Sequence, residues 1–229
     1  MEATGAQAAH TPPDNPAGPY VLRELIRDIP LGVHEEDGSR AYITCVDTWN
    51  GNLYIGTSAG ELLHYVSLPA EDDDNAPTQY IFATKLEPVY NTQQEGEDKG
   101  VKKILLLPHA QKACILCNGT LTFYTLPELS PAFGGKIKQP GCLWVGGIDA
   151  IEHNWGGNAA YGTAIVICLK QKLRLIRIGN EARKIRDIDF SGVCAIQRSQ
   201  DLACVADGQG YSLLDVVNQR KNELFPLPR

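Results

Sequence analysis

Long apolar runs are missing from this chain of 229 residues, and so is any excess of positive charge. No stretch approaches the 18 or so consecutive apolar residues of a membrane-spanning helix, so no such helix is predicted. The N-terminus has neither the basic start nor the apolar segment of a secretory signal. The formal net charge of −6 argues against a nucleic-acid binder that relies on an overall positive field.

Catalytic and cofactor motifs are also absent from the sequence. It contains no G-x-S-x-G elbow and no phosphate-binding P-loop. None of its five histidines has a partner at metal-ligand spacing, and His153, although close to Asp149 and Glu152, is expected in a turn or at the surface. We therefore predict no enzymatic activity, no cofactor and no metal site.

The seven cysteines do not form a disulfide or zinc pattern. Their number is odd and most lie inside apolar segments, which favours reduced, buried thiols in a cytosolic protein. Cys114 and Cys117 have the C-x-x-C spacing of a redox or zinc pair. However, residues three apart on a strand point to opposite faces. Both are therefore predicted to be buried strand cysteines.

What the sequence does contain is a repeat. Residues 43–65 (ITCVDTWNGNLYIGTSAGELLHY), 103–124 (KILLLPHAQKACILCNGTLTFY) and 192–215 (GVCAIQRSQDLACVADGQGYSLLD) share one pattern, and 147–177 are a looser copy. Each contains short apolar strands separated by tight turns such as Asn50-Gly51 and Asn118-Gly119, which favour positive φ. Repeats of this kind indicate an all-β fold, a β-propeller with four-stranded antiparallel blades.

The repeat divides the chain into a flexible tail (1–19) and the N-terminal part of a propeller (20–229). The predicted blades are 20–68, 79–126, 133–179 and 182–216, and a further unit is expected to start at 222–229. Residues 20–28 are expected to form a strand of the first blade, with a short helix as the alternative. Because most propellers close with more than four blades, an incomplete ring at the head of a longer protein is expected, with open edges that allow self-association.

A group of basic residues follows the third repeat. The group consists of Lys170, Lys172, Arg174, Arg177, Arg183, Lys184 and Arg186. Lys172 and Arg174 are predicted to share one face of a strand, while Leu173, Leu175 and Ile176 pack on the other. These cations form either a solvated outer strand or a patch for an acidic partner or anionic lipid headgroups, and both interpretations stay open.

The segments ITCVDTWNGNLYIGTSAGELLHY and KKILLLPHAQKACILCNGTLTFYTLPELSP resemble a citron-homology (CNH) domain. The resemblance covers about residues 20–229. It is closest to the family of the TGF-β-receptor-associated protein and the fungal vacuolar-sorting subunit specific to the CORVET complex. It implies a non-enzymatic propeller followed by an α-solenoid. It further implies that the whole protein is a subunit of an endosomal tether that engages Rab-type GTPases. Such a tether promotes vesicle docking, fusion and transport to the vacuole or lysosome.

The same resemblance implies partners and a location. The expected partners are a Rab-family small GTPase and other tethering subunits, and no nucleic acid is expected to bind. The expected location is the cytoplasmic side of early endosomal or vacuolar membranes, with peripheral membrane contact. The alternatives are the sister subunit of the HOPS complex, or a CNH domain attached to a kinase or a Rho exchange factor.

Overall fold

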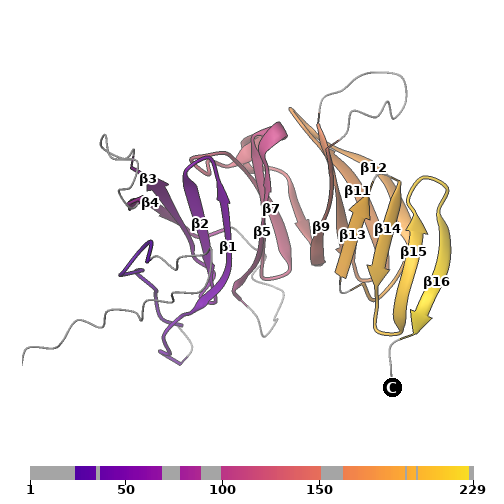
Figure 1. Cartoon of the computed structure of the whole chain (residues 1–229), viewed down its shortest axis with the longest axis horizontal. Coiled ribbons are helices and arrows are strands. Elements are labelled where there is room, and N and C mark those ends of the chain that lie inside the picture. Colours follow the sequence, from indigo (N-terminus) through magenta and orange to yellow (C-terminus); the bar gives the residue numbers. More distant parts are fainter. Residues whose placement is uncertain are drawn as a thin grey trace, which may run out of the picture.

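The computed structural model describes residues 24–34, 37–68, 78–88, 99–150, 162–193, 195–199 and 201–226. These residues form four antiparallel sheets of four strands each, which we call blades 1 to 4 (Figure 1). Two 3-10 helices, η1 (Pro108–Ala110) and η2 (Ala132–Gly135), accompany blade 2. The prediction of an all-β fold with four-stranded blades is confirmed.

In every blade the strands pair in the order in which they follow along the chain. Blade 1 consists of β1 (Ile43–Trp49), β2 (Asn52–Thr57), β3 (Leu62–Ser67) and β4 (Tyr80–Leu86). Blade 2 consists of β5 (Val101–Leu107), β6 (Lys112–Cys117), β7 (Thr120–Thr125) and β8 (Lys138–Pro140). Blade 3 consists of β9 (Cys142–Ala150), β10 (Thr163–Leu169), β11 (Lys172–Ile178) and β12 (Ala182–Asp189). Blade 4 consists of β13 (Ala195–Ser199), β14 (Leu202–Ala206), β15 (Gly210–Asp215) and β16 (Arg220–Pro226).

Local turn chemistry explains the hairpins. Asn50 and Gly51 adopt φ values of 48° and 73° between β1 and β2, and Asn118 and Gly119 adopt 43° and 65° between β6 and β7. Two successive residues with positive φ match the twist of paired antiparallel strands, and Asn-Gly accepts this conformation at low cost. The two turns predicted from the sequence are therefore present.

The blades are placed side by side through their first strands. β1 lies against β5, β5 against β9, and β9 against β13, while the fourth strand of each blade lies at the outer edge of its sheet (Figure 1). This arrangement is that of propeller blades, in which the inner strands converge and the outer strands face away.

Apolar side chains fill the space between successive blades, because each blade is apolar on both faces. The cluster between blades 1 and 2 includes Tyr54, Leu62, Ile104, Leu106 and Ile115. The cluster between blades 2 and 3 includes Leu107, Leu116, Phe123, Ile165 and Ile176. The cluster between blades 3 and 4 includes Val166, Leu173, Leu175, Val205 and Leu214.

The predicted grouping of strands into blades is wrong by one strand. The segments near 79–86 and 182–187, expected to open blades 2 and 4, are β4 and β12, the fourth strands of blades 1 and 3. The segment expected to start a further unit is β16, the fourth strand of blade 4. A repeat shows how often a pattern recurs, but not which strand opens a sheet, because that depends on long-range pairing.

The predicted strand over residues 20–28 is not confirmed. Residues 20–23 lie outside the described part of the chain, as does the predicted tail, and residues 24–28 form neither strand nor helix. Instead, Ile26 and Ile29 pack against a cluster on the face of blade 1 that points away from blade 2. That cluster contains Leu53, Ile55, Leu63 and Tyr65. The N-terminal segment therefore covers the outer apolar face of blade 1.

Candidate protein-interaction surface

Six of the seven basic residues predicted from the sequence lie on β11 and β12, at the outer edge of blade 3, and Lys170 lies in the turn before β11. Side chains alternate along β11. Ile176 and Ile178 lie in the cluster toward blade 2, so Lys172 and Arg174 share that face. Leu173 and Leu175 lie in the cluster toward blade 4. The expected separation of these two leucines from Lys172 and Arg174 is confirmed, but Ile176 packs on the face of Arg174, as the alternation requires.

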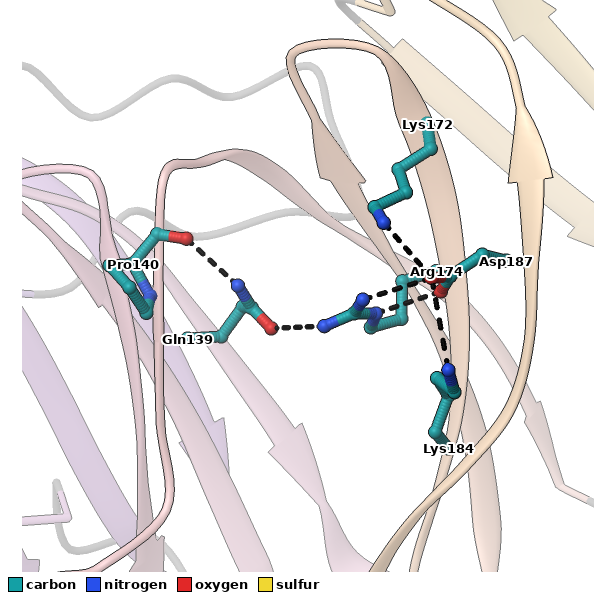
Figure 2. A network of polar contacts seen from close by, with 6 residues as sticks. All are labelled: Gln139, Pro140, Lys172, Arg174, Lys184 and Asp187. Atoms are coloured by element: carbon teal, nitrogen blue, oxygen red, sulfur yellow. Dashed lines mark hydrogen bonds and ion pairs between the residues drawn. The ribbon is translucent and has the colours of Figure 1, made fainter.

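Three of the cations gather around one carboxylate, that of Asp187 (Figure 2). Arg174 donates two hydrogen bonds to it, from Nε to Oδ1 at 2.8 Å and from Nη2 to Oδ2 at 2.9 Å. The Nζ atoms of Lys172 and Lys184 lie 3.1 Å and 4.0 Å from Oδ2. This bidentate pair fixes the Arg174 side chain in one orientation.

The network changes the titration of both members of the pair. The hydrogen bonds from Arg174 hold the pKa of the Asp187 carboxyl well below its ordinary value, although partial burial acts in the opposite direction. The hydrogen bond to Asp187 likewise raises the pKa of Arg174. Asp187 is therefore ionised throughout the neutral range, and the network contains three cations and one anion.

Arg174 also connects two blades. Its Nη1 donates a hydrogen bond of 2.8 Å to Oε1 of Gln139, which lies on β8 of blade 2 (Figure 2). The Gln139 amide in turn donates a hydrogen bond to the carbonyl oxygen of Pro140. Gln139 had no distinguishing signal in the sequence, because its partner lies 35 positions away and on another blade. Arg174 is consequently a structural bridge as well as a member of the basic group.

A second set of cations lies on the opposite face of the hairpin. Arg183 pairs across the strands with Arg177, and Arg186 pairs with Leu175, so all three point toward blade 4. Arg186 Nη1 donates hydrogen bonds to the carbonyl oxygens of Val216 and Val217 in blade 4. Arg186 is thus the counterpart of Arg174 and bridges blades 3 and 4.

The seven predicted residues therefore do not form one flat patch. Lys172, Arg174 and Lys184 point toward blade 2, while Arg177, Arg183 and Arg186 point toward blade 4. Lys170 is exposed in the turn between β10 and β11. Of the seven, Lys170, Arg183 and Lys184 are the exposed side chains, and the others are partly buried against the neighbouring blades.

Four of the described cysteines are buried packing residues (Cys114, Cys117, Cys142 and Cys168), whereas Cys45 is half-buried and Cys204 is exposed, against the prediction of buried thiols. Cys114 and Cys117, on β6, lie in the clusters on opposite sides of blade 2, as their spacing predicted. Burial raises the pKa of the Cys114 thiol far above its ordinary value and that of Cys142 to about 12. Because the thiolate is the reactive form, these two side chains are inert at neutral pH. Within the described ranges, no three His, Cys, Asp or Glu side chains converge as metal ligands.

Comparison with known proteins identifies the family. The family model for the VPS3 N-terminal domain matches residues 39–229. The chain belongs to this family. Its sequence is 29% identical over 215 residues to vacuolar protein sorting-associated protein 3 of Saccharomyces cerevisiae. That alignment covers 93% of this chain but 18% of the yeast protein, so the chain spans less than a fifth of the length of its relative.

Solved structures show the same architecture as this VPS3 N-terminal domain. The AfRom2 CNH domain has a TM-score of 0.52 at 15% identity, covering 85% of this chain and 58% of that chain. The WD40 domain of Neurospora crassa Pan2 has a TM-score of 0.51 at 11% identity, covering 79% of this chain and 49% of that chain. The resemblance to a CNH domain of the vacuolar-sorting family is confirmed, and so is the propeller fold. In the described part of the chain, no helix is long and apolar enough to cross a membrane.

Proposed function

We propose that this chain is a non-enzymatic interaction domain of an endosomal tethering subunit of the CORVET type. In this role it acts in Rab-dependent vesicle docking and fusion and in transport from endosomes to the vacuole or lysosome. The observation that carries the proposal is the family match over residues 39–229, together with similarity to a yeast vacuolar sorting protein over 93% of the chain. The propeller fold supports it, because propellers commonly present surfaces to partners.

The chemistry of the described side chains also favours binding over catalysis. Burial raises the pKa of the Cys114 and Cys142 thiols, which removes them as nucleophiles. His64 is buried, with 4% of its surface exposed, and stacks on Tyr54 between blades 1 and 2. The charged network around Asp187 holds blades together at an outer edge. Each of these groups has a packing or bridging role.

In this proposal the domain works on the cytoplasmic side of early endosomal or vacuolar membranes. Its partners are a Rab-family GTPase and the other subunits of the tether. The VPS3 family match favours this tether over a CNH domain attached to a kinase or a Rho exchange factor.

The GTPase partner is tested by affinity capture. The 229-residue chain is immobilised and exposed to early- and late-endosomal Rab GTPases, each loaded with GDP or with a non-hydrolysable GTP analogue. We expect at least about tenfold greater retention of a GTP-loaded early-endosomal Rab, which corresponds to about 1.4 kcal/mol. Equal retention of both nucleotide states, or retention of neither, would contradict the assignment of GTPase binding to this domain.

The outer face of blade 4 supports the further proposal of self-association. Leu202, Tyr211 and Phe225 share that face with exposed fractions of 47%, 38% and 58%, and no other described segment covers them. The rings of Tyr211 and Phe225 are in contact, with centroids 5.2 Å apart. An exposed apolar sheet face of this kind favours association with a second apolar surface.

Replacing Phe225 with Ser is therefore expected to reduce concentration-dependent association of the chain by about threefold or more in sedimentation experiments. The matched control is Ile137→Ser, which removes an apolar side chain that is 37% exposed beside blade 2. A monomeric wild-type chain at all accessible concentrations, or an equal effect of the control, would refute self-association through this face.

A further inference from the structure

Positive charge is concentrated on a single hairpin of this acidic protein. Residues 170–189 contain seven Lys and Arg side chains against Glu181, Asp187 and Asp189, for a formal charge of +4. The net charge of the whole chain is −6, so the remaining residues sum to −10. β11 and β12 hold six of the seven cations at the outer edge of blade 3, on both faces of the sheet, and Lys170 lies in the turn that precedes β11.

Edge protection does not account for this concentration. A charged side chain on an outer strand prevents unwanted strand pairing, and one lysine often suffices. The other outer strands of this molecule follow that pattern, with Lys85 on β4, Lys138 on β8, and Arg220 and Lys221 on β16. In contrast, β12 contains three cations, and the neighbouring strand β11 contains three more.

Some of these cations are engaged in contacts within the protein, whereas others remain exposed to solvent. Arg174 and Arg186 are engaged in bridges to the neighbouring blades. Asp187 is shared among three cations, and within the described ranges no other acidic side chain lies at ion-pair distance from Lys184. Lys184 remains 60% exposed, and Lys170 is exposed at the other end of the hairpin, in the turn that precedes β11. Arg183 is 71% exposed and pairs with Glu181, whose side chain is 67% exposed.

We infer that the outer edge of blade 3, with Arg183 and Lys184 at one end and Lys170 at the other, is a docking surface for an extended acidic segment of a protein partner, with Arg174 and Arg186 holding the hairpin in place. Exposed cations in excess of their counter-ions attract acidic segments and accelerate their association. This inference is independent of the small-GTPase proposal, because it rests on the charge of the hairpin and not on the identity of the partner.

The shape of the surface favours a protein over a membrane. Peripheral membrane sites usually combine cations with apolar side chains that insert among the lipids. Between residues 162 and 193, all of which are described, no large apolar side chain is exposed. The cations also point to both faces of the blade, which suits a segment that wraps around an edge and not a flat lipid surface.

The test uses the 229-residue chain and a short fluorescent peptide of alternating Glu and Ser, measured by fluorescence anisotropy at low and physiological salt. The variant Lys170→Glu/Lys184→Glu leaves both bridging arginines intact. The matched control, Lys136→Glu/Lys138→Glu, makes the same charge change on exposed lysines of blade 2. We expect the first variant to weaken binding about fivefold or more and the control less than about twofold.

A second variant and a vesicle assay complete the experiment. Lys170→Gln/Lys184→Gln removes the two charges without reversing them. It should also weaken peptide binding more than the Lys136→Glu/Lys138→Glu control does, with an unchanged melting temperature. The proposal fails if the wild-type chain does not bind the peptide, or if both double variants weaken binding equally. It also fails if vesicles of phosphatidylcholine and phosphatidylserine, but not the peptide, bind in a manner that depends on Lys170 and Lys184.

Discussion

Replacing Arg174 with Ala is expected to lower the free energy of unfolding by about 2 kcal/mol. The Arg174 side chain is 24% exposed and donates two hydrogen bonds to Asp187 and one to Gln139 on the adjacent blade. Its loss leaves the partly buried Asp187 carboxylate without its main partner and removes a side-chain hydrogen bond between blades 2 and 3. Hydrogen bonds to charged groups contribute more than neutral ones, and an unpaired buried charge adds to the loss.

Urea denaturation of the variant and of a matched control measures this effect. Arg183→Ala also removes an arginine that pairs with a carboxylate at 2.8 Å, but this pair is 71% and 67% exposed. Exposed pairs contribute little, so a change of about 0.5 kcal/mol or less is expected for the control. Equal losses of stability in the two variants would show that neither partial burial nor the contact with blade 2 increases the contribution of Arg174 to the free energy of unfolding.

The same pair predicts a response to acid. The pKa of Asp187 is depressed in the folded state, so its stabilisation is fully present above the ordinary carboxyl pKa and is lost as the pH falls below that value. Arg174→Ala removes the main cause of the depression. The difference in stability between wild type and variant should therefore shrink on acidification below about pH 4.

Acidification through pH 6.5 is expected to destabilise the domain through a different residue, His64. Its Nε2 donates a hydrogen bond of 2.8 Å to Oδ1 of Asn52, and its ring stacks on Tyr54 with centroids 4.8 Å apart. Nδ1 is buried without a hydrogen-bond partner among the described residues. Burial lowers the pKa of His64, although the charge of Glu128 acts in the opposite direction.

The sign of the effect follows from this direction. Between the depressed pKa of the folded state and the ordinary value near 6.5, the unfolded chain binds a proton that the folded chain does not. Stability therefore falls as the pH falls through this window, by up to about 1.4 kcal/mol per pH unit. The pKa of Tyr54 is raised to about 12 by burial, so this neighbour does not titrate in the same range.

Denaturation between pH 7.5 and pH 5.5 tests this expectation. His64→Gln keeps a donor for Asn52 and removes the titrating ring, so its stability should vary less with pH in this window. His109→Gln, at an exposed position, is the matched control and should retain the wild-type slope. An identical slope in all three proteins would show that His64 is not the group that titrates.

Much of this fold was predictable because its determinants are local. The Asn50-Gly51 and Asn118-Gly119 turns set hairpins through their own backbone preferences. Alternation placed Cys114 and Cys117 on opposite faces and separated Arg174 from Leu175. Repetition of these local patterns indicated propeller blades, and the dispersed resemblance to the CNH domain pointed to the family that the comparisons confirm.

Contacts between distant residues decided the rest. The blades begin one strand later than the repeat suggested, because a periodic pattern is unchanged when its starting strand is shifted and only pairing selects the start. Ile26 and Ile29 cover the outer face of blade 1 instead of forming a strand. The apolar face on which they pack is formed by residues 53–65, which are distant in sequence. The seven cations lie close together in sequence but are divided in the fold between bridges to two neighbouring blades and an exposed edge. That division depends on Gln139 and Val216, which meet the hairpin only when the blades pack together.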